Sequence, residues 1–291
     1  MAQKYRFIEQ ENGKKAHKHE LLINGQWQEV RGASTIVKVL GKEGLTYWAA
    51  GLAVKELSGI EDCKVLTKIK NGKAKPEEIA EVENSVVSWL NEHAGMGVED
   101  YIKLCQKAYS AHATNLKDTA EAGTDLHELL EDYVKDCTVS NDSKPKLLKG
   151  DTWDERVVDF SKWCVDNVKR FLWSEAHCYN EELLVGGITD CGAEFKDGTF
   201  GIIDFKSAKE TYFNHFVQCA VYDLLIKKNS ICDKDGVIAP GLERLNFTKY
   251  VIVPFGAKEF MAVENTGVEG FKRSALACMA LDKEIFVFNK E

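Results

Sequence analysis

The fold is decided by residues 177–206, which read HCYNEELLVGGITDCGAEFKDGTFGIIDFK. Two largely apolar runs, 177–195 and 199–206, flank the sequence Lys196-Asp197-Gly198, whose composition is typical of a turn. We expect an antiparallel hairpin with a three-residue loop, in which Gly198 takes the left-handed conformation of a G1 bulge. A two-residue Asp197-Gly198 turn is the alternative, and it would shift the strand pairing by one residue.

In the three-residue register, Asp190 lies directly opposite Asp204, with the two Cβ atoms about 4.5–5.5 Å apart. Lys206 comes two residues later and projects from the same face as Asp204. Adjacent carboxylates repel each other unless a cation lies between them, and their oxygen atoms suit Mg²⁺ or Mn²⁺. The other register would place the carboxylates on opposite faces. A solvated strand face is the alternative for Asp204 and Lys206, although the apolar neighbours at 201–203 and Phe205 favour a buried strand.

The rest of the chain alternates between helical and extended patterns. A short hairpin is predicted within 20–30, turning at Asn24-Gly25, and Ser34 and Thr35 are candidate caps of a short helix. Helices are predicted at 43–58, 76–93, from about 99, 119–137, 153–173, 209–228 and 267–285, strands at 247–254 and 259–264, and connections at 61–75 and 138–151. This mixture predicts an α/β (mixed α+β) fold, in which helices flank a central mixed sheet.

Composition limits the class of protein. The 291 residues are 44% hydrophobic and 29% charged, so a packed core is expected. The net charge of -8 argues against a simple basic-patch nucleic-acid binder but allows an acidic site for divalent cations. No uncharged apolar run approaches 18 residues, and the N-terminus lacks the apolar segment of a secretory signal. We therefore expect a cytoplasmic protein that does not associate with membranes.

The 9 cysteines include no C-x-x-C pair, so we expect reduced thiols and no iron–sulfur cluster. A zinc site built from Cys164, His177, Cys178 and Cys191 is an alternative that the wide spacing disfavours.

Four short motifs occur in a characteristic order: GTDLH at 123–127, GITD at 187–190, IIDFK at 202–206 and QCAVY at 218–222. Together they resemble the PD-(D/E)XK nuclease superfamily in its RecB-like exonuclease branch, over about 119–255. Residues 31–40, RGASTIVKVL, are similar to the S-V-T-x-I-L opening of phage and mitochondrial-maintenance exonucleases of that branch, with Ala33 where many relatives have proline. The resemblance implies an accessory or bridge segment at 1–118 and a PD-(D/E)XK core at 119–291.

Carried over to this sequence, the resemblance implies a metal site made by His127, Asp190, Asp204 and the backbone carbonyl of Phe205. Lys206 would orient or deprotonate the attacking water, the latter if its pKa is lowered. The number of metal ions stays open. His127 alone could equally be a structural histidine, and its HExxE context lacks the second histidine of the HExxH metalloproteases.

The same resemblance implies DNA contacts. Gln218 would touch DNA near the active site, and Tyr222 would stack on a base or bond a phosphate. The alternative for these two residues is a helix face that packs on the sheet. In the opening motif, Ser34 and Thr35 are further candidate DNA contacts.

The implied function is that of a Mg²⁺- or Mn²⁺-dependent DNA exonuclease acting from free, single-stranded ends in replication, repair or recombination. If the chain is phage-encoded, it would work in the host cytoplasm. The alternatives are a structure- or sequence-specific endonuclease of the same fold and a catalytically inert DNA-binding subunit. The presence of Asp190, Asp204 and Lys206 together disfavours the inert subunit.

Overall fold

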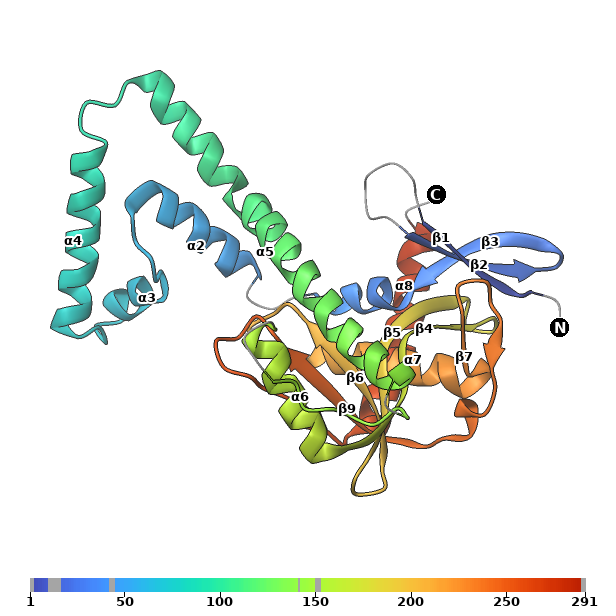
Figure 1. Cartoon of the computed structure of the whole chain (residues 1–291). Helices are drawn as coiled ribbons and strands as arrows, with labels where there is room; N and C mark the ends of the chain where they lie inside the picture. The colour runs from blue at the N-terminus through green and yellow to red at the C-terminus, as the bar shows by residue number, and fades with distance from the viewer. Residues whose placement is uncertain (1–2, 10–16, 42–44, 141, 150–152, 289–291) are drawn as a thin grey trace. The chain divides into compact units, whose positions relative to one another are not determined.

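The computed structural model describes residues 3–9, 17–41, 45–140, 142–149 and 153–288 (Figure 1). The chain divides into two compact units, one made of 1–41 with 123–291 and the other of 42–122. The first unit holds every strand of the described residues, and the second is helical. The chain is thus a mixed α/β protein, as the sequence predicts.

The first unit is built on a curled mixed sheet. Its central strands are β4 (Val168–Asn180), β5 (Val185–Phe195), β6 (Phe200–Lys206) and β9 (Phe247–Pro254). Neighbouring strands pair in that order, antiparallel from β4 to β6 and parallel between β6 and β9. Short strands extend both edges: β10 (Val263–Asn265) pairs with β9, β7 (Ile231–Cys232) pairs with β4, and β8 (Ile238–Ala239) pairs with β7.

The β5–β6 hairpin has the three-residue loop. Cys191 pairs with Ile203 and Glu194 with Phe200, which is the register that aligns Asp190 with Asp204. The Phe195 amide donates to the carbonyl of Thr199 at 2.8 Å, and Gly198 has φ of +83°. The predicted register and the left-handed glycine are therefore both confirmed. The paired ladder ends at Cys191, so Asp190 and Asp204 lie one step beyond the last pair.

Residues 1–41 belong to the same unit as the central sheet. β1 (Tyr5–Glu9), β2 (His17–Ile23) and β3 (Gln26–Gly32) form an antiparallel meander, with the expected turn at Asn24-Gly25. β3 then pairs in parallel with the start of β5, through Arg31 with Val185 and Gly32 with Gly186. We expected residues 1–118 to form one segment, but residues 1–41 belong with the sheet. The pairing that joins β3 to β5 links residues more than 150 positions apart, so no local sequence pattern indicates it.

Helices cover the two faces of the sheet with separate apolar cores. α7 (Phe213–Asn229) and α8 (Val268–Phe288) pack on the face that contains Ile202 and Ile252. The C-terminal part of α5 (Val98–Ser140) and α6 (Glu155–Asn167) pack on the face of Ile203 and Val251. Alternate residues of β6 and β9 therefore point into different cores, which explains their unbroken apolar sequences.

Several local predictions are wrong. The helix expected at 153–173 ends at Asn167, and β4 begins at Val168, since Val168, Phe171 and Trp173 are buried on a strand. The run 177–195 is two strands, separated by a turn at 181–184. The connection expected at 61–75 contains helix α3 (Lys64–Lys70).

The expected caps are also wrong. The short helix α1 (Ala33–Ile36) is capped at Gly32, so Ser34 and Thr35 lie inside it, and a 3₁₀ turn, η1 (Val37–Leu40), follows.

The second unit contains α2 (Leu45–Ser58), α3, α4 (Pro76–Glu92) and the first part of α5. Glu56 joins α2 to its neighbours: its carbonyl accepts from Trp89 Nε1 at 3.0 Å, and its carboxylate pairs with Lys107 at 2.7 Å. Over the described residues of both units, no helix is long and apolar enough to span a membrane.

Candidate metal centre

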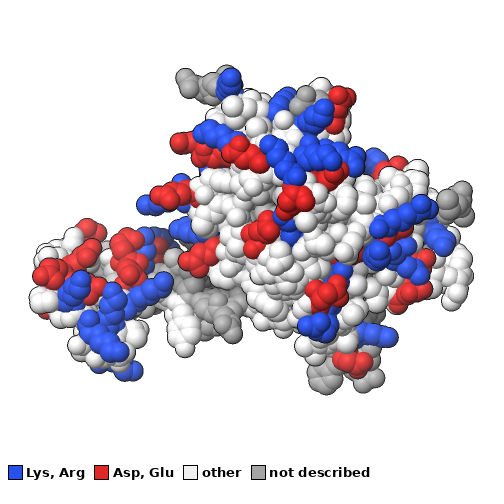
Figure 2. All heavy atoms as spheres, turned by 90° about the horizontal axis from the view of Figure 1, so that it is seen from below, with Lys and Arg blue, Asp and Glu red and all other residues white. Residues whose placement is uncertain are grey.

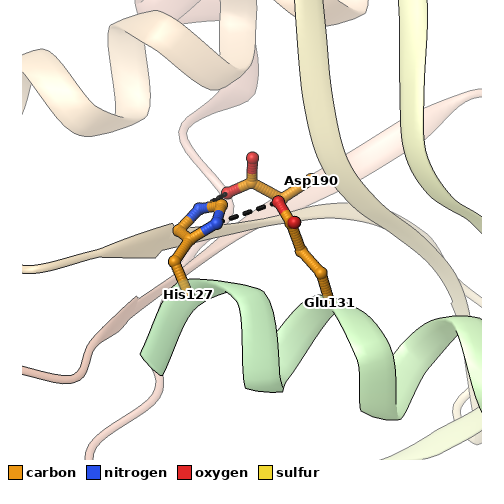
Figure 3. A group of neighbouring side chains, drawn as sticks. All are labelled: His127, Glu131 and Asp190. Carbon is orange, nitrogen blue, oxygen red and sulfur yellow. Dashed lines mark ion pairs between the residues drawn. The ribbon is translucent and has the colours of Figure 1, made fainter. Parts of the chain in front are cut away.

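His127, Glu131 and Asp190 bring three ligand-type atoms within 4.8 Å of one another (Figure 3). His127 and Glu131 are four residues apart on α5 and therefore share a helix face. His127 Nδ1 lies 2.9 Å from Glu131 Oε1, and His127 Nε2 lies 3.4 Å from Asp190 Oδ2. The imidazole thus sits between a helix carboxylate and a strand carboxylate.

α5 is held in this position by its apolar side. Leu126, Leu130, Tyr133 and Cys137 recur at helical spacing and are buried in the core that α5 shares with α6. His127 lies next to this stripe, and its ring meets the edge of Phe205 at 5.7 Å. The apolar pattern that predicts the helix therefore also fixes where His127 points.

Asp190 lies at the point where strand β5 changes its pairing strand. Its strand, β5, pairs with β3 at 185–186 and with β6 at 191–194, and Asp190 falls between these two ladders. Its carboxylate accepts a hydrogen bond from the Phe205 amide at 2.7 Å, so the side chain extends the ladder. Burial raises the pKa of Asp190, but His127, Lys206 and this amide together bring it below its ordinary value. Asp190 is therefore ionised at neutral pH.

The same contacts set the charge of His127. Burial lowers the pKa of His127, yet the hydrogen bonds to Asp190 and Glu131 outweigh it and raise the pKa from 6.5 to about 10. Without a metal, the imidazole is a cation held by two carboxylates. A metal ion at Nε2 would replace that proton, and Nδ1–H would still donate to Glu131, the arrangement usual for histidine ligands.

Asp204 and Lys206 form a second, deeper pair. Lys206 Nζ lies 2.5 Å from Asp204 Oδ2, which confirms that the two side chains share a face. Asp204 is 1% exposed, and its Oδ1 accepts no hydrogen bond from the described residues. Burial first, and the nearby Asp190 carboxylate second, raise the pKa of Asp204 to about 6 despite the attraction of Lys206. A buried carboxylate oxygen without a donor is one that a cation would satisfy.

The donor set therefore fits a hard divalent cation. His127, Glu131 and Asp190 stand together, whereas Asp204 lies outside the 4.8 Å group and is engaged by Lys206. The contact that Phe205 makes here is through its amide rather than its carbonyl. None of the cysteines joins the donor groups found in the described part of the chain, so the cysteine–histidine zinc alternative gains no support.

Lys206 is not primed as a base in this state. Burial lowers the pKa of Lys206, but Asp204 and Asp190 outweigh burial and raise the pKa above its ordinary value. The lowered pKa was expected for Lys206 beside a bound metal ion, and for that state it stays a prediction. Lys206 is an ammonium group here, suited to orient an oxygen atom or to offset negative charge.

Gln218 and Tyr222 face each other on α7. Gln218 Nε2 donates to the Tyr222 hydroxyl at 2.7 Å, and both side chains are buried. The Tyr222 ring covers Gly187, where a Cβ atom would come within 2.9 Å of it. Because the ring is enclosed, Tyr222 has no free face for a nucleobase, which corrects the stacking role. The alternative of a helix face packed on the sheet describes the ring better.

Ser34 and Thr35 lie in α1, beside Ala33, which also packs close to Gly187. Ser34 is exposed and Thr35 is half-buried. The structure thus brings α1 near Tyr222, but Ser34 and Thr35 are not among the residues of the candidate metal centre, which are His127, Glu131 and Asp190.

Two acidic residues near the candidate metal centre, Glu131 and Glu175, were not predicted as site residues from the sequence. Glu131 had a usable signal, its i,i+4 spacing from His127. Glu175 had none, because it sits in β4 between the pairs Ser174–Cys191 and Ala176–Thr189, opposite Asp190. Burial, Glu131 and Asp190 raise the pKa of Glu175.

A cavity of about 700 Å³ opens beside Glu131, between α5, β4 and the β7–β8 segment. The described residues that line it include five carboxylates, of Glu128, Glu131, Asp132, Glu175 and Asp233, against one lysine, Lys135. Such a lining repels polyanions.

No protein-family model matches this chain, and no curated protein matches it.

Proposed function

We propose that this chain is a Mg²⁺- or Mn²⁺-dependent deoxyribonuclease with a PD-(D/E)XK core, which degrades DNA from free ends as an exonuclease. The observation that carries the proposal is the pairing of two acidic centres on adjacent strands. Asp190 faces His127 and Glu131, and the buried Asp204 faces Lys206. Cation ligands beside an ammonium group suit phosphodiester hydrolysis, because a bound cation activates water and positive charge stabilises the transition state.

The topology supports the proposal. A helix with the first motif precedes an antiparallel β4–β5–β6 sheet, and a helix with the last motif follows β6. β9 then returns parallel to β6. The four motifs thus occupy α5, β5, β6 and α7. β5, β6 and α7 contact one another, and the part of α5 in the same unit meets β5 and β6 through His127.

In the proposed enzyme, His127, Asp190 and Asp204 would hold the cation, with Glu131 orienting His127. The bound cation would supply an activated water and neutralise charge on the phosphate. With the cation in place as the partner of Asp204, Lys206 would direct its ammonium group to the reacting oxygen atoms.

Action from free ends is supported by the surface charge. The net charge is -8, and over the face drawn in Figure 2 basic and acidic side chains are interspersed. Several of the lysines are paired, as in Lys162 with Asp159 and Lys169 with Glu194. Nonspecific attraction of duplex DNA is therefore weak. The endonuclease is kept as the second candidate, since the same two centres serve either enzyme.

The test compares linear DNA with covalently closed circular DNA of the same sequence, both single- and double-stranded. Each is incubated with Mg²⁺, Mn²⁺ or chelator at one salt concentration. We expect metal-dependent loss of linear single strands while circles are largely spared. Equal rates on linear and circular DNA would favour the endonuclease, and no cleavage with either metal would refute the nuclease.

A further inference from the structure

α7 carries a row of side chains that leads from the candidate metal centre to the protein surface. Tyr222, Gln218 and His215 are spaced three or four residues apart and lie on one face of the helix, and Tyr212 is the N-cap residue that precedes its first turn. The first three are buried, whereas Tyr212 is 47% exposed. Tyr212 thus forms the outer end of a row whose inner end touches β5.

The row begins close to the carboxylates. Tyr222 packs on Gly187, three residues before Asp190 on β5. Ile202 packs with Cys219 and Tyr222 in the core that α7 covers, and Asp204, two residues after Ile202 on β6, projects from the same face. The α7 face with Cys219 and Tyr222 therefore borders the Asp204–Lys206 pair.

The outer end of the row is also tied to Lys206. Residues 207–211 run directly from Lys206 to Tyr212, and hydrogen bonds from Phe255 N to Lys206 O (2.9 Å) and from Gly256 N to Ala208 O (3.1 Å) fix the start of this loop. A Cβ atom at Gly256 would lie 2.2 Å from the Ser207 carbonyl, so the packing is close.

The Tyr212 ring itself is positioned by His215. The Tyr212 amide donates to His215 Nδ1 at 3.3 Å, and the two rings meet edge to face with centroids 5.4 Å apart. Beside this contact, Tyr212 remains 47% exposed, so part of the tyrosine surface is open to solvent. The next residue, Phe213, is equally exposed but turns away from the row and contacts Phe271 at 5.6 Å.

The charge around the candidate site is uneven, and the exposed Lys209 of the 207–211 loop lies next to the exposed Glu210. The charged residues that line the cavity beside Glu131 are five carboxylates and one lysine, so the cavity repels phosphate groups. The α7 side presents Lys206 and, in the loop, the exposed Lys209.

On this basis, and resting on the proposed function, we infer that Tyr212 is the residue on which a nucleobase of the substrate strand stacks. The enclosed Tyr222 holds Gln218 and the sheet in place. Ten residues separate Tyr222 from Tyr212, about 15 Å along a helix. At roughly 3.4 Å per stacked nucleotide, the contacted base lies about four nucleotides from the inner end of the row. Stacking accepts any base, which suits an enzyme that degrades DNA regardless of sequence.

The experiment measures single-turnover cleavage and equilibrium binding of a labelled single-stranded oligonucleotide. Tyr212→Ala and Tyr212→Leu remove the aromatic ring, Tyr212→Phe keeps it, and Phe213→Ala is the matched control at the same helix end. Loss of a base–aromatic stack costs roughly 5- to 150-fold in affinity. We expect that loss in Kd and KM for the Ala and Leu variants, with kcat nearly unchanged, and wild-type values for the Phe variant and the control.

A series of oligonucleotides with one abasic site each locates the contact. In the wild-type protein, one abasic position near the cleaved bond should weaken binding as much as Tyr212→Ala does. In Tyr212→Ala, the same abasic position should have no further effect. Wild-type affinity in both ring-deleted variants, or additive losses, would overturn the stacking role while leaving a wild-type nuclease intact. A wild-type protein that neither binds nor cleaves DNA would instead refute the proposed function.

Discussion

Replacing Asp204 with asparagine is expected to stabilise the metal-free protein. Asp204 is 1% exposed, lies near the Asp190 carboxylate, and has one oxygen atom without a hydrogen-bond donor. Ionising it in this environment costs free energy that Lys206 only partly offsets. The amide side chain of the variant would carry no charge, so the folded state would lose that cost. Such a gain is common where a binding site is built at the expense of stability.

The size of this free-energy cost follows from the pKa of Asp204. Burial and Asp190 raise the pKa of Asp204 from 3.8 to about 6. Each unit of pKa difference between the folded and unfolded states corresponds to 1.36 kcal/mol, so ionising Asp204 costs about 3 kcal/mol at pH 7. The Asp204→Asn variant recovers only part of this cost, because the buried ammonium group of Lys206 loses its carboxylate partner. The sign follows from proton binding: between about pH 4 and pH 6 the folded carboxyl keeps its proton while the unfolded one has lost it. This group therefore lowers stability as pH rises through that window, and its full cost is present above about pH 6.

Urea unfolding in excess chelator at several pH values measures the effect. The gain from Asp204→Asn should be largest at pH 7 and shrink towards pH 4. Asp159→Asn, which breaks a surface pair with Lys162, is the matched control and should change the free energy of unfolding by less than about 0.5 kcal/mol. If Asp204→Asn is as stable as the wild type at pH 7, or less stable, then ionised Asp204 has no net cost in the folded protein.

Three further predictions concern the metal and the reaction. Glu131→Gln should weaken metal binding about 10- to 100-fold in a calorimetric titration, because His127 loses its orienting carboxylate, whereas the exposed neighbour Glu128→Gln should leave it unchanged. Lys206→Ala should lower the cleavage rate about 10²–10⁴-fold with little change in metal affinity, and near-normal turnover would make Lys206 a structural charge. Because hydrogen bonds to Asp190 and Glu131 raise the pKa of His127 to about 10, metal binding at pH 7 must displace a proton. Metal affinity should therefore rise by up to about tenfold per pH unit between pH 7 and pH 9, and a flat profile would contradict ligation by His127.

The central hairpin was predictable because its information is local. The sequence Lys196-Asp197-Gly198 allowed a three-residue loop or a two-residue turn, and the structure has the three-residue loop, which fixes the register of Asp190 against Asp204. The mutual position of Asp204 and Lys206 follows from the two-residue repeat of a strand. These residues, with the apolar stripe that places His127, define most of the candidate site.

What the sequence did not predict depends on distant contacts. The pairing of Arg31 with Val185 joins parts of the chain that are more than 150 residues apart, so the membership of residues 1–41 had no local signal. Glu175 is placed opposite Asp190 only by the β4–β5 pairing. The burial of Tyr222 against Gly187 likewise depends on tertiary packing, and it decides that the ring cannot stack on a base.

The most direct test of the account is the hydrolysis of an end-labelled single-stranded DNA by wild-type protein and by Asp204→Asn, each with Mg²⁺ and with chelator. The wild-type protein should cleave the DNA with Mg²⁺ and should not cleave it with chelator. The account predicts no cleavage by Asp204→Asn under either condition, although that variant unfolds at a higher urea concentration when metal is absent. Full activity of Asp204→Asn in Mg²⁺, or of the wild type in excess chelator, would contradict it.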